Sequence, residues 1–96
     1  MNLLIVVSTA NALEALLGLS AACLRGGQTF SCFVTGEGVR VLGDPSVVGM
    51  LESSQHVVVC EYSWNRYFSD NTLPFEGGSQ TDHSAMISEA DQVVSL

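Results

Sequence analysis

Hydrophobic and polar positions form alternating blocks along the chain, and these blocks predict strands and helices in turn. Apolar, β-branched runs at 2–7, 28–35 and 56–60 are typical of strands buried on both faces of a parallel sheet. Between the first two runs, apolar residues recur at helical spacing over 13–24, and glycines at 26–27 end that helix. The chain therefore opens as strand–helix–strand, with a connection long enough for a right-handed parallel crossover.

The second half of the chain continues this alternation. Asp44 as N-cap and Pro45 at the first helical position predict a short helix over 43–54. The pattern as a whole predicts an α/β fold: a single domain over 1–96, a three-layer sandwich around a mainly parallel sheet of about four to five strands, with helices on both faces. The other predicted segments are a tight turn at 36–39, a loop or short helix at 61–70, an exposed turn-rich stretch at 71–80, a helix at 81–90 capped by Thr81 or Asp82, and a final strand at 91–96.

Charge and composition narrow the function. The net charge is −7 and the chain has no lysine, so nucleic-acid binding and attraction to anionic membranes are not expected. Hydrophobic residues make up 47% and charged residues 14%, which favours self-association. No cation precedes the first apolar run, and Asn11 and Glu14 interrupt it, so we expect neither a signal peptide nor a membrane span but a folded cytoplasmic protein. Three cysteines without tight spacing favour reduced thiols.

Candidate chemistry gathers where parallel strands end. Loops at 8–11, 36–39 and 60–64 should meet at the carboxyl edge of the sheet, and Cys60 lies at that edge. A helix beginning after Cys60 would lower the pKa of its thiol, whereas the neighbouring Glu61 would disfavour the thiolate. The alternative is a buried, inert cysteine. The residues predicted to line a pocket around Cys60 are Glu37, Gly38, Glu61, Trp64 and Arg66.

Other chemistry-bearing residues have simpler interpretations. Cys23 falls beside the apolar stripe of the first predicted helix, and Cys32 lies inside the second predicted strand, so core positions are expected for both. His56 and His83 have no partners at metal-ligand spacing, so we expect no metal. The "TGEGV" turn lacks both the lysine of a phosphate-binding loop and the third glycine of a dinucleotide fingerprint, so we expect no cofactor.

Four stretches in this order resemble the DsrE/DsrF/DsrH-like family, which includes the Tus proteins of sulfur relay. They are "ACLRGGQTFSCF", "FVTGEGV", "VVVCEYSWNRY" and "HSAMISEADQVVSL". The resemblance implies a three-layer α/β domain assembled as a homo-oligomer (trimer or hexamer) or as a hetero-oligomer with related subunits. It also implies a persulfide on the cysteine at this strand end, here Cys60, with sulfur donor and acceptor proteins as partners. The chain departs from the family pattern at "NRYF", where a glycine follows the arginine in relatives.

Three functions stay open on the sequence. The first is a small sulfur carrier, a sulfurtransferase-like protein that relays sulfane sulfur on Cys60 by thiol exchange. The second is a non-catalytic oligomeric binding or regulatory subunit of the same fold. The third is a thiol peroxidase-like role, which requires a sulfenic acid on Cys60 and a resolving thiol from Cys23 or Cys32.

Overall fold

One five-stranded sheet organises the molecule. The computed structural model describes residues 2–69 and 72–96. All strand pairs are parallel, and the strand order is β4-β3-β2-β1-β5. The elements along the chain are β1 (Asn2–Val7), η1 (Ala10–Ala12), α1 (Leu13–Arg25), β2 (Thr29–Val34), η2 (Gly36–Gly43), α2 (Pro45–Leu51), β3 (His56–Cys60), α3 (Glu61–Phe68), β4 (Glu76–Gly78), α4 (Gln80–Glu89) and β5 (Gln92–Ser95).

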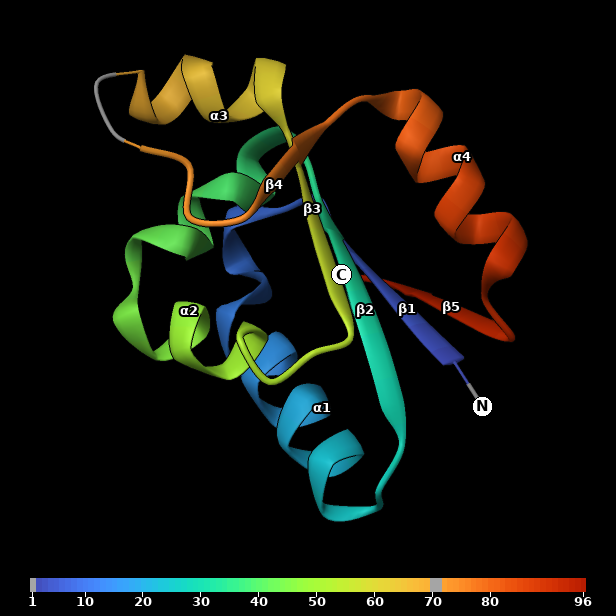
Figure 1. Cartoon of the computed structure of the whole chain (residues 1–96). Coiled ribbons are helices and arrows are strands. Elements are labelled where there is room, and N and C mark those ends of the chain that lie inside the picture. Colours follow the sequence, from blue (N-terminus) through green and yellow to red (C-terminus); the bar gives the residue numbers. More distant parts are fainter. Residues whose placement is uncertain (1, 70–71) are drawn as a thin grey trace.

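Helices cover both faces of the sheet, as Figure 1 shows, with α1 and α2 on one side and α4 on the other. The chain steps from β1 to β4 in one direction and then returns across the sheet to β5. Because parallel crossovers are right-handed, reversing the direction of travel moves the connecting helix to the opposite face. The α/β class and the parallel sheet predicted from the sequence are therefore confirmed.

Two buried clusters lie on the two faces, and β1 contributes to both. Leu3, Ile5 and Val7 pack in the larger cluster with α1, α2 and η2, whereas Leu4 and Val6 face α4. The alternation follows from the two-residue repeat of a strand. It explains why the run at 2–7 is apolar at every position rather than at every second one.

The predicted N-cap of α2 is confirmed, and the N-cap of α4 is a different residue from those predicted. The side chain of Asp44 accepts a hydrogen bond from the Ser46 amide at 2.8 Å, and Pro45 opens α2. Helix α4 begins earlier than predicted, because Ser79 rather than Thr81 or Asp82 is the N-cap. Ser79 and Asp82 form a capping box that satisfies backbone amides at the first turn.

Two other segments differ from the sequence prediction, and a third forms one of its two predicted alternatives. The turn expected at 36–39 extends into the 3-10 helix η2, because Val39, Val41 and Leu42 are buried and draw the chain onto the core. Residues 61–68, left open between loop and helix, form α3. The stretch predicted as an exposed turn contains β4, whose pairing is supplied by the edge of β3 and not by strand propensity. Residues 70 and 71, at the junction of those two predicted segments, lie outside the described residues.

Candidate functional site

The candidate site is a row of three residues at the carboxyl edge of the sheet. Val34 of β2 pairs with Val59 of β3, so Thr35 and Cys60 follow as the next neighbours. Cys60 in turn pairs with Gly78 of β4. Adjacent strands lie about 4.8 Å apart, which brings these three residues close together. Their order along the sheet is Thr35, Cys60, Gly78.

A cavity of about 540 Å³ opens over this row. Cys60 is 7% exposed and belongs to the cluster on the α4 face of the sheet. The sulfur is therefore largely covered by neighbours but lies against an open space. The lining residues are Thr35, Gly36, Cys60, Glu61, Tyr62, Ser63, Gly78, Ser79 and Gln80.

The surroundings of Cys60 favour its thiolate. Burial acts to raise the pKa of the thiol, but hydrogen-bond donors outweigh it, and the pKa is lowered from its ordinary value. The donors are the hydroxyl and amide of Ser63, the hydroxyl of Thr35 and the amide of Tyr62. These donors favour the charged form because a thiolate is a stronger hydrogen-bond acceptor than a neutral thiol.

Helix geometry places Ser63 on the sulfur. Cys60 is the N-cap of α3, and a cap side chain faces the amides of the second and third helical residues, here Tyr62 and Ser63. Ser63 is 5% exposed, and its Oγ accepts a hydrogen bond from the Gly36 amide at 2.8 Å. Because that amide occupies the oxygen as acceptor, the hydroxyl proton is available to Cys60.

Two glycines lie near Cys60 at positions where a side chain would be strained or would not fit. Gly36 adopts φ 56°, a left-handed conformation that suits glycine and sets its amide toward Ser63. A Cβ on Gly78 would lie 2.6 Å from both Asp82 Oδ2 and Val58 Cγ1, so a side chain there has no space. Close packing at Gly78 therefore fixes the backbone of β4 next to Cys60.

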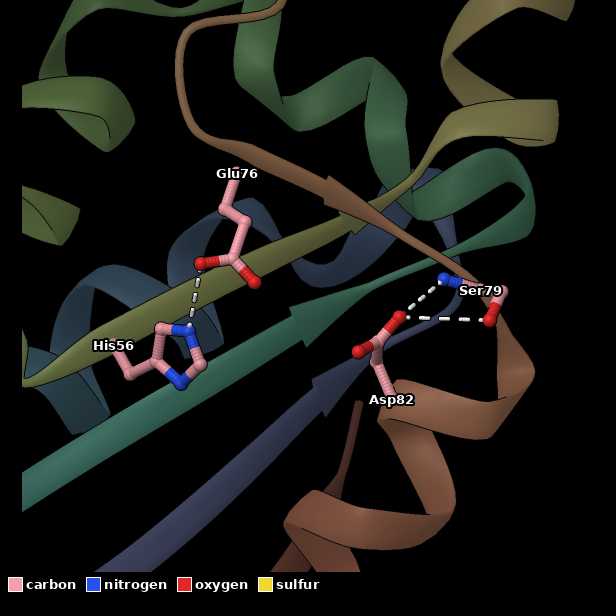
Figure 2. A network of polar contacts seen from close by, with 4 residues as sticks. All are labelled: His56, Glu76, Ser79 and Asp82. Atoms are coloured by element: carbon pink, nitrogen blue, oxygen red, sulfur yellow. Dashed lines mark hydrogen bonds and ion pairs between the residues drawn. The ribbon is translucent and has the colours of Figure 1, made fainter.

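The opposite wall is the start of α4. Figure 2 shows Asp82 turned back to the cap, where its Oδ2 accepts from the Ser79 amide at 2.8 Å. The same view shows His56 at the other end of β3, with Nε2 3.3 Å from Glu76 Oε1 on β4. These contacts anchor both ends of the short β4, and so hold Gly78 and Ser79 beside Cys60.

Of the pocket residues predicted from the sequence, Glu61 joins Cys60 at this cavity. Its carboxylate lies over Gly77, since a Cβ on that glycine would meet the Glu61 side chain. Glu61 therefore turns toward β4, and it is not among the groups that shift the pKa of Cys60.

The other predicted pocket residues lie elsewhere. Glu37 is solvent-exposed with Arg40 3.9 Å away, and Gly38 is packed so closely on the Val7 carbonyl that no Cβ fits. Trp64 is buried and stacks on Phe68 with ring centroids 4.5 Å apart. The Arg66 guanidinium lies 5.8 Å from the ring centroid of Tyr67. None of these four is among the described residues that line the Cys60 cavity.

The other two cysteines lie in the core on the opposite face of the sheet. Cys23 of α1 and Cys32 of β2 are both buried there, and all three thiols are free. Burial raises the pKa of Cys32 to about 12, with a smaller contribution from Cys23. The sheet separates both from Cys60, which faces α4.

Sequence reasoning missed Thr35, Ser63 and Gln80. One local signal was present, because a cysteine ending a strand with a serine three residues later matches the cap and third positions of a helix. No local signal links Gln80 to the site, since α4 reaches it only through the fold.

Neither a metal centre nor a membrane span is found in the part of the chain that the structure describes. No group of three or more His, Cys, Asp or Glu side chains there is arranged to hold a metal ion. No helix among the described residues has both the length and the apolar character needed to cross a bilayer.

Comparisons of this chain with models of protein families, with curated proteins and with solved structures found no match.

Proposed function

We propose that Cys60 is a nucleophilic thiol that carries sulfane sulfur as a persulfide between a donor and an acceptor. The observation that carries the proposal is the set of donors around Cys60, which favours its thiolate at the wall of an open cavity. The thiolate is the reactive form in sulfur exchange, so a lowered pKa increases the reactive fraction near neutral pH. The resemblance in sequence to sulfur-relay proteins points to the same residue.

The loading step is an exchange without net oxidation. The Cys60 thiolate attacks the outer sulfur of a donor persulfide, the donor's sulfur–sulfur bond breaks, and the donor leaves as a thiolate. The new Cys60 persulfide keeps the outer sulfur and its proton. In the unloading step an acceptor thiolate attacks that outer sulfur, and the Cys60 thiolate is the leaving group.

The same hydrogen bonds assist both steps. Before loading they favour the attacking thiolate, and during unloading they stabilise the charge that returns to the Cys60 sulfur. A thiol of lower pKa is the better leaving group, which suits a residue that must release sulfur as well as take it.

The topology of the cysteines disfavours the peroxidase-like alternative. An intramolecular resolving thiol must reach the Cys60 sulfur, and disulfide geometry requires Cα atoms within about 7 Å. Cys23 and Cys32 pack on the far face of the sheet. A carrier that exchanges sulfur with other proteins needs no second cysteine of its own.

Donor and acceptor proteins would approach from the open side of the cavity. Tyr62, which lines it, is 76% exposed and offers an aromatic contact there. Three free cysteines suit a reducing compartment such as the cytoplasm, and oligomeric assembly is part of the same proposal.

Intact-protein mass spectrometry tests the proposal. Folded wild-type protein, incubated with a small persulfide donor, should gain sulfur that a thiol reductant removes. Cys60→Ser should gain none, whereas Cys32→Val, which deletes a thiol in the core, should load like wild type. No added sulfur on folded wild type would refute a carrier role and favour the non-catalytic binding function.

A further inference from the structure

We infer that Gln80, held by His83, is a positioning residue that aims the Thr35 hydroxyl at the Cys60 sulfur. This inference deepens the proposed function and rests on Cys60 acting as a thiolate. It concerns a second set of hydrogen bonds that reaches Cys60 from α4, independent of the one that runs through Ser63.

The contacts form a chain from the helix to the strand ends. His83 Nδ1 lies 3.1 Å from Gln80 Oε1, and Gln80 Nε2 lies 3.5 Å from Thr35 Oγ1. Thr35 stands next to Cys60 in the register of β2 and β3. His83 and Gln80 are three residues apart in α4 and share one face of that helix.

The donor and acceptor in each of these hydrogen bonds can be assigned by starting from the sulfur. A thiolate only accepts, so Thr35 must direct its proton to Cys60 and use its oxygen to accept from Gln80 Nε2. The amide of Gln80 then presents its oxygen to His83, which makes Nδ1 the protonated nitrogen of that ring. Every donor in the chain therefore points toward Cys60.

Stacking on an aromatic ring restricts the His83 side chain, which is the last residue in this series of hydrogen bonds. Its ring lies parallel to Phe33 of β2, with centroids 4.6 Å apart and an interplanar angle of 6°. Phe33 precedes Thr35 by two residues, so both side chains lie on the α4 face of the sheet. Strand β2, which ends one residue before Thr35, thus also holds the residue that orients Gln80.

The test is a double-mutant cycle on the pKa of Cys60. The pKa is read as the pH midpoint of alkylation of the full chain by iodoacetamide, followed at Cys60 by peptide mass spectrometry. Gln80→Met removes both amide contacts from an exposed position without adding charge. We expect it to slow alkylation at a fixed pH below the midpoint by about two- to fivefold, the effect of one modest hydrogen bond. In a Thr35→Val background, Gln80→Met should have no further effect.

Three further variants keep the test decisive if Thr35→Val does not fold. Gln80→Glu replaces the amide with a carboxylate that only accepts, so Thr35 turns its proton away from the sulfur and the midpoint rises. Thr81→Glu adds the same charge one residue along α4, outside the chain of contacts, and should raise the midpoint much less. His83→Phe keeps the stack on Phe33 but removes the donor, and it should raise the midpoint in the same direction as Gln80→Met.

The outcomes separate this inference from the proposed function. An unchanged midpoint in Gln80→Met, or an equal rise in the wild-type and Thr35→Val backgrounds, would overturn the positioning role. A change only in the high-pH plateau rate would indicate altered access to the cavity and would also overturn it. If the midpoints shift as expected but wild type takes up no sulfur, the hydrogen-bond chain stands and the carrier function falls.

Discussion

Replacing Ser63 with alanine should raise the pKa of Cys60 more than removing the hydroxyl of Thr35, the other side-chain donor. Ser63 contributes two of the donors that lower this pKa, its hydroxyl and its amide. Alanine removes the hydroxyl and keeps the amide and the helix. The substitution also leaves the Gly36 amide without the oxygen that accepts from it at 2.8 Å.

The size of the effect follows from the kind of bond that is lost. A hydrogen bond to a charged group contributes about 1.5–3 kcal/mol, and a pKa unit corresponds to about 1.4 kcal/mol. The site is open to water, which replaces part of the lost interaction, so the lower end applies. We expect the pKa of Cys60 to rise, with a thiolate fraction about tenfold smaller at a fixed pH below the midpoint. The stranded Gly36 amide should lower the free energy of unfolding by about 1 kcal/mol.

Ultraviolet absorbance of the thiolate measures the pKa directly, with the titration of Cys60→Ser subtracted. Ser63→Thr retains a hydroxyl and should restore part of the shift. Ser88→Ala is the matched control, because Ser88 Oγ donates to the Ala85 carbonyl at 2.9 Å on α4, away from Cys60. A folded Ser63→Ala protein with the wild-type midpoint would refute the reasoning, since no other change was made to the donors.

The other predictions concern the core and the glycines. The Cys32 thiol stays neutral in the folded state but ionises in the unfolded state. The free energy of unfolding is therefore unaffected by this group below its ordinary pKa of 9.0, and it falls as the pH rises toward about 12. In chemical denaturation, the free energy of unfolding of wild type should fall by about 4 kcal/mol over that pH range relative to that of Cys32→Val. The same pH dependence in both proteins would contradict this. Gly38→Ala should lower the free energy of unfolding by more than about 1 kcal/mol, because its Cβ would collide with the Val7 backbone. Gly18→Ala, which has open space around it, should stabilise the protein slightly. A melting temperature equal to that of wild type in either variant would contradict the prediction for that variant. Gly78→Ala should destabilise the protein because its Cβ would lie 2.6 Å from both Asp82 Oδ2 and Val58 Cγ1, and a wild-type melting temperature would contradict this.

Much of the fold could be predicted because its signals are local. The apolar runs that became β1, β2 and β3 are continuous, and Asp44 and Pro45 mark the start of α2 by their own chemistry. Strand β4 could not be predicted in this way. Gly77 and Gly78 have low strand propensity, and only the unpaired edge of β3 makes them extended.

The sequence by itself determined that Cys60 ends a buried strand, because the continuous apolar run before it is a local signal, and it left open whether a loop or a helix follows. It did not determine the partners of Cys60. Trp64 is one residue beyond Ser63, about 100° further around α3, so the serine faces the sulfur while the indole enters the core. Thr35 and Gln80 reach the site from β2 and α4, 45 residues apart in the chain. Strand register and the docking of α4 set those contacts, and both depend on how distant segments pack, which no local pattern specifies.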